Sequence, residues 1–230
     1  KHAKPQALIA TGPNQVWSWD ITYLPSEVRG EFYRLYLVID VYSRFIVGWE
    51  EHDNESAEHA SVLVSKACLR HKVRKDQLVL HSDNGSPMKG ATMLSTLQKL
   101  GIIPSFSRPS VSDDNPYSEA MFRTLKYSPA YPSKPFASLN AARDWVHHFA
   151  TWYNNEHCHS GIKFVTPAQR HNGEDRIVLE QRNATYQAAK TANPARWKGR
   201  KTRNWEHENE VWLNPEKEKI SEPENLKQVA

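Results

Sequence analysis

The sequence has 230 residues, of which 39% are hydrophobic, 24% charged and 10% aromatic, so it supports one large or two small folded domains and excludes a chain that is disordered throughout. It contains no run of about 18 nearly uncharged apolar residues, and two cysteines are too few for a disulfide framework or a four-cysteine zinc site. We therefore expect a cytoplasmic protein without a membrane span; the net charge of +4 is compatible with a nucleic-acid partner but does not identify one.

Aromatic and β-branched residues predict three strands near the start of the chain. After an extended N-terminal arm (residues 1–15), the pattern predicts strands over residues 16–24, 32–39 and 45–49. The second of these strands is nearly all apolar, as is typical of a central, buried strand. Short links between the three strands favour an antiparallel meander.

Helical and strand patterns alternate over the next part of the chain. We expect helices over residues 55–71 and 90–100, strands over 78–80 and 102–106, and a helix that begins with Asn115 as N-cap and Pro116 in its first turn. A proline-rich link leads to a long helix from about Ser138, with an apolar face of Leu139, Ala142, Trp145, Val146, Phe149 and Trp152. This order predicts an α/β fold with a mixed five-stranded sheet and helices on both faces.

The composition changes after about residue 171. We expect a helix over residues 174–190, a short strand over 209–215, which belongs to a candidate small β module that binds DNA, and a poorly ordered end over 217–230. Residues 191–204 form either a solvated loop or a DNA-binding surface, because they contain no acid and five cations, Arg196, Lys198, Arg200, Lys201 and Arg203. The chain thus divides into an arm (1–15), a core (16–171) and a small α+β C-terminal segment (172–230).

Three carboxylates occupy positions that suggest metal chemistry. Asp20 lies in the middle of the first predicted strand among apolar residues, and a buried carboxylate is costly unless it is paired or binds a metal. Asp83 follows the fourth strand, where functional groups gather in open α/β sheets, and Glu119 lies on the first turn of a helix. Mg²⁺ prefers carboxylate oxygens, so three acids on rigid elements predict a divalent-metal site suited to phosphoryl transfer.

Each acid also has an ordinary structural explanation, and other acids compete for the same role. An isolated Asp at the end of a strand is most often a turn or cap residue. The predicted hairpin places Asp20 opposite Tyr36 and Asp40 four residues away, about 13 Å at about 3.3 Å per residue, which is too far to share an ion. Asp113 and Asp114 lie in a polar loop, a less rigid scaffold for metal ligands.

The segments around the three acids resemble a known family. They read WSWDITY around Asp20, HSDNGS around Asp83 and DNPYSEA around Glu119, and 35 residues separate the last two acids. With DVYSRFIVGW (40–49), they resemble the catalytic core of retroviral integrases, most closely the D,D-35-E transposases of bacterial insertion sequences, over residues 13–171. The resemblance implies a ribonuclease-H-like fold, the three acids as catalytic metal ligands, Mg²⁺ or Mn²⁺ as cofactor, and cleavage and strand transfer of DNA.

The same resemblance implies partners and DNA contacts. Arg123 and Lys126 follow Glu119 by four and seven residues, so they share its helix face, either as DNA contacts or in a simple surface ion pair. Family members carry basic residues at these offsets. The resemblance further implies transposon-end and target DNA as partners, a homodimer or larger complex on that DNA, and an association with the bacterial nucleoid.

Further motifs and two rival functions complete the expectations. The short motifs WYNN, HSG and TPA (residues 152–168) resemble the terminal signature of these transposases, and we expect them to end and brace the last core helix. His157, Cys158 and His159 only weakly suggest zinc, since nearby sequence lacks further ligands. The chain does not begin with Met, and we expect part of a longer protein whose remainder recognises transposon ends. The rivals are a ribonuclease-H-like nuclease without strand transfer and a domesticated DNA-binding protein.

Overall fold

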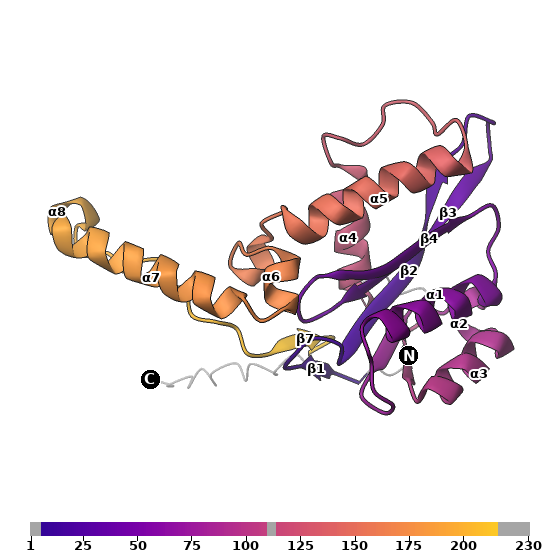
Figure 1. The fold of residues 1–230 in the computed structure, drawn as a ribbon, viewed down its shortest axis with the longest axis horizontal. Helices are drawn as coiled ribbons and strands as arrows, with labels where there is room; N and C mark the ends of the chain where they lie inside the picture. Colours follow the sequence, from indigo (N-terminus) through magenta and orange to yellow (C-terminus); the bar gives the residue numbers. More distant parts are fainter. Residues whose placement is uncertain (1–5, 110–113, 216–230) are drawn as a thin grey trace, which may run out of the picture.

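The computed structural model describes residues 6–109 and 114–215, and a five-stranded sheet forms its centre (Figure 1). The strand order is β4-β3-β2-β5-β6. β2 (Val16–Pro25), β3 (Phe32–Asp40) and β4 (Ile46–His52) form an antiparallel meander, and β5 (Val79–Ser82) and β6 (Ile103–Phe106) run parallel to β2. The predicted mixed sheet is confirmed.

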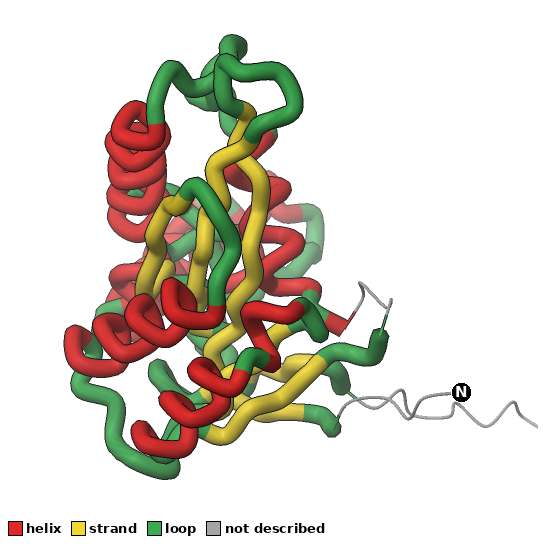
Figure 2. Tube along the Cα trace, turned by 90° about the vertical axis from the view of Figure 1, so that its right-hand side faces the viewer, coloured by secondary structure: helices red, strands yellow, loops and turns green. Residues whose placement is uncertain are grey.

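Helices cover both faces of this sheet (Figure 2). On one face, Trp17 and Trp19 of β2 join a buried cluster with side chains of α1 (Ala57–Arg70) and α3 (Ala91–Leu100); a short helix, α2 (Ser86–Lys89), which the sequence pattern did not predict, lies between them. On the other face, apolar residues of β2, β3 and β4 cluster with those of α4 (Pro116–Lys126) and α5 (Leu139–Asn155). Successive residues of a strand point to opposite faces, so the side chains of β2 alternate between the α1 and α3 side of the sheet and the α4 and α5 side.

Local signals in the sequence set several helix ends as expected. The Ser56 hydroxyl accepts a hydrogen bond from the amide of His59 at the start of α1, and Ser138 does the same for Ala141 at the start of α5. Gly101 ends α3 in the left-handed region at φ 68°, a conformation that glycine adopts without strain.

The long helix α5 follows its predicted apolar stripe with one exception. Ala142, Val146 and Phe149 are buried, but Trp152 is 36% exposed and Tyr153 takes its place in the core. The next residue, Asn154, donates to the carbonyl of Ile46 (3.1 Å) and accepts from its amide (2.8 Å). These two bonds agree with the expected bracing role of this segment.

The C-terminal segment extends from the body and then returns to it. After a 3₁₀ turn, η2 (Ser160–Ile162), and α6 (Pro167–His171), helix α7 (Asp175–Ala192) projects from the body and ends at α8 (Pro194–Trp197) (Figure 1). The returning chain forms β7 (Val211–Leu213), the predicted strand.

Strand β7 pairs antiparallel with β1 (Leu8–Ala10), a short strand within the extended N-terminal arm that the sequence pattern did not predict. The partner strands lie about 200 residues apart in sequence, and no local pattern can reveal such a pairing. Their inner side chains form a buried cluster with Val16, Val41 and Tyr42 of the core. The segment predicted to be poorly ordered, residues 217–230, lies outside the described residues.

Within the described ranges, no helix combines the length and the apolar character needed to cross a membrane.

Candidate active site

Asp20 and Asp83 lie next to each other on neighbouring parallel strands. The register between β2 and β5 pairs Trp19 with Ser82. Asp20 follows Trp19 within β2, and Asp83 directly follows Ser82, the last residue of β5. Trp19 faces the α1 and α3 cluster, so the alternation places Asp20 on the face covered by α4. The structure thus brings two of the three predicted site residues together.

The competing acids serve structural roles. Asp20 pairs with Leu37 rather than with the predicted Tyr36, because the connection between the strands is centred half a residue later than assumed. Asp40 is fully buried and accepts hydrogen bonds from the amides of Asn14 and Ser43, both at 2.7 Å, so it fixes two turns.

The loop acids do not compete either. Asp114 is buried and forms a two-pronged ion pair with Arg108, whose Nε and Nη2 donate to its oxygens at 2.9 Å. This bond lowers the pKa of Asp114 and keeps it ionised as a partner of the guanidinium. Asp113 lies outside the described residues.

Hydrogen bonds hold the helix that carries Glu119 against the strand that carries Asp20. The hydroxyl of Ser18 bonds to the side chains of Asn115 and Ser118, the latter at 2.7 Å. Asn115 also donates from Nδ2 to a carbonyl of β2 (3.3 Å). Asn115 therefore precedes the helix as predicted, but its side chain makes no capping bond to α4 and ties the helix to the sheet instead.

The pKa of Asp20 shows which other acids lie close enough for their charges to act on it. Burial, the largest cause, and the charges of Asp83, Glu119 and Glu55 together raise it from 3.8 to about 7, against a hydrogen bond from the amide of Ile21 that lowers it. Burial and like charge both disfavour the ionised carboxylate. A cation bound here would reverse both effects, because it supplies the opposite charge that the carboxylate needs.

Glu55 is an acid that our interpretation of the sequence missed. It is exposed, directly precedes the N-cap of α1, and accepts a hydrogen bond from the hydroxyl of Tyr23 (2.5 Å). No motif marks it in the sequence. Only the folded arrangement, in which the loop after β4 reaches Tyr23 of β2, shows that its charge acts on Asp20.

The donor atoms suit a divalent cation, although the side chains do not enclose one in this conformation. Over residues 6–109 and 114–215, no group of three or more His, Cys, Asp or Glu side chains has the geometry to hold a metal ion. Oδ1 of Asp83 accepts from Ser107 (2.8 Å) and Oδ1 of Asp20 from Ile21 (2.8 Å), which leaves Oδ2 of each acid outside these bonds. Glu119 is exposed on the first turn of α4.

The weak zinc hypothesis finds no support among the same described residues. Cys158 is exposed, and the rings of His157 and His159 contact each other edge to face at 5.8 Å beside Tyr153. Burial lowers the pKa of both histidines, as in a packed aromatic cluster.

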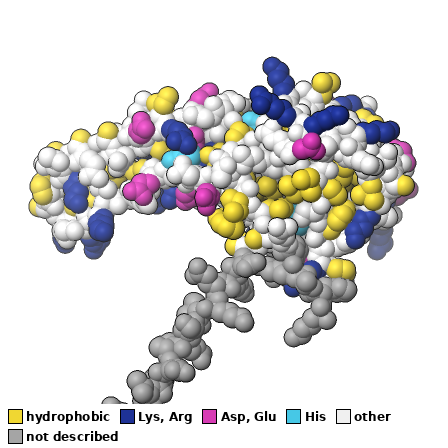
Figure 3. All heavy atoms as spheres, turned by 90° about the horizontal axis from the view of Figure 1, so that it is seen from below, with side chains coloured by type: hydrophobic (Ala, Val, Ile, Leu, Met, Phe, Trp, Pro, Cys, Tyr) yellow, Lys and Arg dark blue, Asp and Glu magenta, His cyan; other side chains and the backbone are white. Residues whose placement is uncertain are grey.

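The predicted DNA contacts fall into two separate groups. Arg123 and Lys126 are exposed on α4, the helix of Glu119, whose buried side is formed by Met121, Phe122 and Leu125. The basic side chains of the C-terminal segment lie at the far end of the projecting arm, where Figure 3 shows Lys and Arg side chains; they are Arg196, Lys198, Arg200 and Lys201. Helix α7, with 18 residues and a length of about 27 Å, separates this second group from the acids.

Comparison with known families and proteins gives a consistent result. Two models of the integrase core domain match residues 10–112 and 100–167. The transposase for insertion sequence element IS904 of Lactococcus lactis is 32% identical over 162 residues, which cover 70% of this chain and 63% of that protein. Transposase InsF for insertion sequence IS3A of Escherichia coli is 31% identical over 168 residues, 73% of this chain and 57% of the relative. The chain thus spans about three fifths of the length of these relatives.

Solved structures share the fold. A chain of the simian T-cell lymphotropic virus intasome superposes with a TM-score of 0.54 at 21% identity and covers 74% of this chain and 59% of its own length. The HTLV-2 integrase catalytic core domain, solved in complex with magnesium in a trimeric form, gives a TM-score of 0.50 at 19% identity, with coverages of 70% and 97%. The ribonuclease-H-like fold expected from the sequence is confirmed.

Proposed function

We infer the function from family membership: the chain belongs to the integrase core family and is related to the transposases of bacterial insertion sequences. We propose that it forms the catalytic part of a DNA transposase. Water first attacks a phosphodiester at the end of the element and frees a 3′-OH, and this 3′-OH then attacks a phosphodiester of the target DNA. Each step exchanges one P–O bond for another, so no redox partner is needed.

The placement of Asp20 and Asp83 on neighbouring parallel strands, with the charge of Glu119 acting on Asp20, is the observation that supports this proposal. Asp20 and Asp83 project from adjacent strands and provide donors in fixed positions, and Glu119 adds a third donor from α4. Mg²⁺, or Mn²⁺ in its place, suits this donor set. When bound, two such ions activate the attacking oxygen and stabilise the leaving oxygen of the phosphate.

We further propose two modes of DNA binding. Arg123 and Lys126 contact phosphates beside the acids, because they lie one and two turns beyond Glu119 on an exposed face of α4. The basic end of the arm, with Arg196, Lys198, Arg200 and Lys201, binds phosphates farther along the duplex. Such contacts fix the position of DNA without reading its sequence. A homodimer or larger complex that pairs two element ends in the bacterial nucleoid completes the proposal.

Joining of pre-cut element ends to a target duplex tests the function directly. In Mg²⁺, we expect joined products from the unaltered protein and a loss of more than about a thousandfold in Asp83→Asn and Glu119→Gln. DNA affinity and thermal stability should persist in both variants. Asp53→Asn, which removes an exposed acid without a side-chain hydrogen bond, is the matched control and should join at the normal rate.

The two rival functions give different results in this assay. A nuclease without strand transfer would cut the duplex and leave pre-cut ends unjoined. A DNA-binding protein without activity would hold DNA with high affinity at all Mg²⁺ concentrations and leave it intact. Unchanged joining in Asp83→Asn would remove the assignment of the acids.

A further inference from the structure

The backbone carbonyl of Asp114, just before α4, joins three distant parts of the chain. It accepts a hydrogen bond from Nε2 of His81 (2.9 Å), which lies two residues before Asp83 on β5. It accepts a second hydrogen bond from Nδ2 of Asn214 (2.8 Å), which directly follows β7. The strand of one proposed metal ligand, the helix of another and the C-terminal strand therefore meet at one oxygen atom.

Asn214 is built into this position. Its side chain is buried, with 5% exposure, and its backbone has a φ of 56°, a left-handed conformation that Asn adopts more readily than most residues. A second hydrogen bond joins the same two parts of the molecule: the hydroxyl of Tyr117 on α4 donates to the carbonyl of Trp212 on β7 (2.7 Å). Strand β7 and the residue that follows it thus contact Asp114, two residues before α4, and Tyr117, the second residue of this helix.

Strand β7 is itself fixed to the core. It pairs with β1 in the register Leu8 to Leu213, and both strands bury side chains in the cluster that contains Val16. Figure 1 shows the two strands side by side at the lower end of the sheet. A rigid element is therefore available to hold the start of α4.

The start of α4 needs such support for a physical reason. The first N–H groups of a helix have no partners within the helix, and Pro116 has no N–H at all. The position of the first turn, which carries Glu119, therefore depends on bonds from outside the helix. Asn115 provides the link to β2, and Asn214 provides the link to the C-terminal segment.

We propose that β7 is a brace of the active site and that Asn214 is a positioning residue, which holds the start of α4 so that Glu119 stays close to Asp20 and Asp83. The role of Glu119 in this statement rests on the proposed function. For its strand, the brace replaces our expectation of a small DNA-binding β module over residues 191–215, since the inner side of β7 and the side chain of Asn214 are buried against the core.

Two substitutions remove the bond and keep the backbone conformation. Asn214→Asp has the same shape and tolerates the left-handed region, but its carboxylate cannot donate to the Asp114 carbonyl and repels it. Asn214→Gly favours the same conformation and removes the side chain. Asn183→Asp makes the same change of charge at an exposed site on α7 and serves as the control.

Hydrogen exchange measured by mass spectrometry tests the brace without any assay of activity. In both Asn214 variants of the full chain, we expect amides of α4 to exchange about tenfold faster, while amides of α1 keep their protection. The control should match the unaltered protein throughout. Unchanged protection of α4 in both variants would overturn the brace, even if the protein joins DNA. Faster exchange in α1 as well would show a general loss of stability and would also contradict it.

Mg²⁺-dependent joining then tests the positioning role. We expect the Asn214 variants to join at least about tenfold more slowly and to need more Mg²⁺ for half-maximal rate, at equal DNA affinity. A shift in the Mg²⁺ requirement separates positioning from a loss of folded protein, which would lower the rate at every concentration equally. A normal rate and Mg²⁺ requirement in both variants would refute the positioning role. If the unaltered protein joins no DNA, the proposed function fails, and the exchange experiment still decides on the brace.

Discussion

Two clusters of charged side chains, one around Asp20 and one around Arg170, are built in opposite ways. At the sheet edge, the charges that act on the pKa of Asp20 most strongly are those of other carboxylates. At the base of α7, the guanidinium of Arg170 is matched by the carboxylate of Asp175 (3.2 Å). Matched charges hold a structure together, whereas like charges brought together raise the free energy of the fold and indicate a binding site for an ion of opposite charge.

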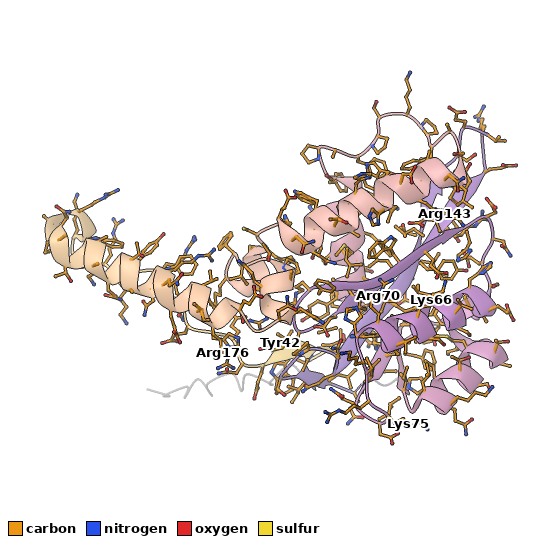
Figure 4. All side chains as sticks on the ribbon, viewed as in Figure 1. Tyr42, Lys66, Arg70, Lys75, Arg143 and Arg176 are labelled. Atoms are coloured by element: carbon orange, nitrogen blue, oxygen red, sulfur yellow. The ribbon has the colours of Figure 1, made fainter. Side chains whose placement is uncertain are left out.

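The second cluster, which we call the arm joint, comprises Tyr42, Arg170, Asp175 and His207. Arg170 is 1% exposed and donates to the carbonyls of Tyr42 (2.9 Å) and Glu208 (2.8 Å) as well as to Asp175. It also stacks over the ring of Tyr42, which lies where α7 leaves the body (Figure 4). His207 contacts the same carboxylate at 3.0 Å. The joint therefore fixes both the outgoing and the returning chain of the arm.

Removal of Arg170 should have the largest effect on stability. We expect Arg170→Ala to lower the free energy of unfolding by about 3–5 kcal/mol, because Asp175 would stay buried without the guanidinium that balances its charge. Urea denaturation measures this change. Arg176→Ala, an exposed substitution on the same helix, should cost less than about 0.5 kcal/mol. Equal effects of the two variants would show that the arm joint does not stabilise the fold.

Removal of the charge of Asp20 should instead raise the free energy of unfolding. The folded state raises the pKa of Asp20 from 3.8 to about 7, so between these values it binds a proton that the unfolded state releases. The ionised carboxylate therefore destabilises the fold most above pH 7, and the penalty disappears below about pH 4. We expect Asp20→Asn to raise the free energy of unfolding by about 2 kcal/mol at pH 8, and this gain to vanish toward pH 4. A constant or negative difference in urea denaturation would contradict the raised pKa.

The same pKa predicts competition between protons and the metal. Below pH 7, a cation must displace the proton of Asp20, so we expect the Mn²⁺ concentration for half-saturation to rise by up to about tenfold per pH unit. Above pH 7 it should level off. Electron paramagnetic resonance of free Mn²⁺ measures this binding without DNA. A half-saturation that is independent of pH from 5 to 8 would refute the role of Asp20.

The smallest effect should come from the end of the arm. Replacement of Arg200 and Lys201 by Gln should reduce the slope of log affinity for DNA against log salt by about 2, because about two fewer counterions are released. Stability should stay unchanged, since both side chains are exposed. The control is Lys134→Gln, which removes a single exposed cation of the proline-rich link. An unchanged slope in the double variant would show that DNA does not bind to these two side chains.

The sequence predicted the features that depend on local pattern. Alternation marked the strands, Gly101 marked the end of α3, and the spacing between Asp83 and Glu119 identified the family. The register of β2 and β3 was wrong by one residue, because the hairpin connection has several lengths that the sequence cannot distinguish. One such slip exchanges the partner of Asp20 but leaves its face unchanged, since that face follows from alternation along its own strand.

Features that depend on distant parts of the chain escaped prediction. Asn115 looks like a helix cap in sequence, yet its side chain bonds to Ser18, 97 residues earlier. Glu55 acts on Asp20 only through the folded sheet, and the pairing of β1 with β7 joins the two ends of the described chain. The three acids proposed for the site lie in recognisable sequence motifs, whereas no sequence motif marks the hydrogen bonds that position them.

The central claim is that Asp20, Asp83 and Glu119 form one site for divalent cations. Crystals soaked in Mn²⁺ and measured at the manganese absorption edge test it most directly. We expect an anomalous peak within about 2.2 Å of carboxylate oxygens of both Asp20 and Asp83, with Glu119 turned toward it, and no peak in crystals of Asp83→Asn. Manganese bound only elsewhere on the molecule, with these three carboxylates still apart, would contradict the claim.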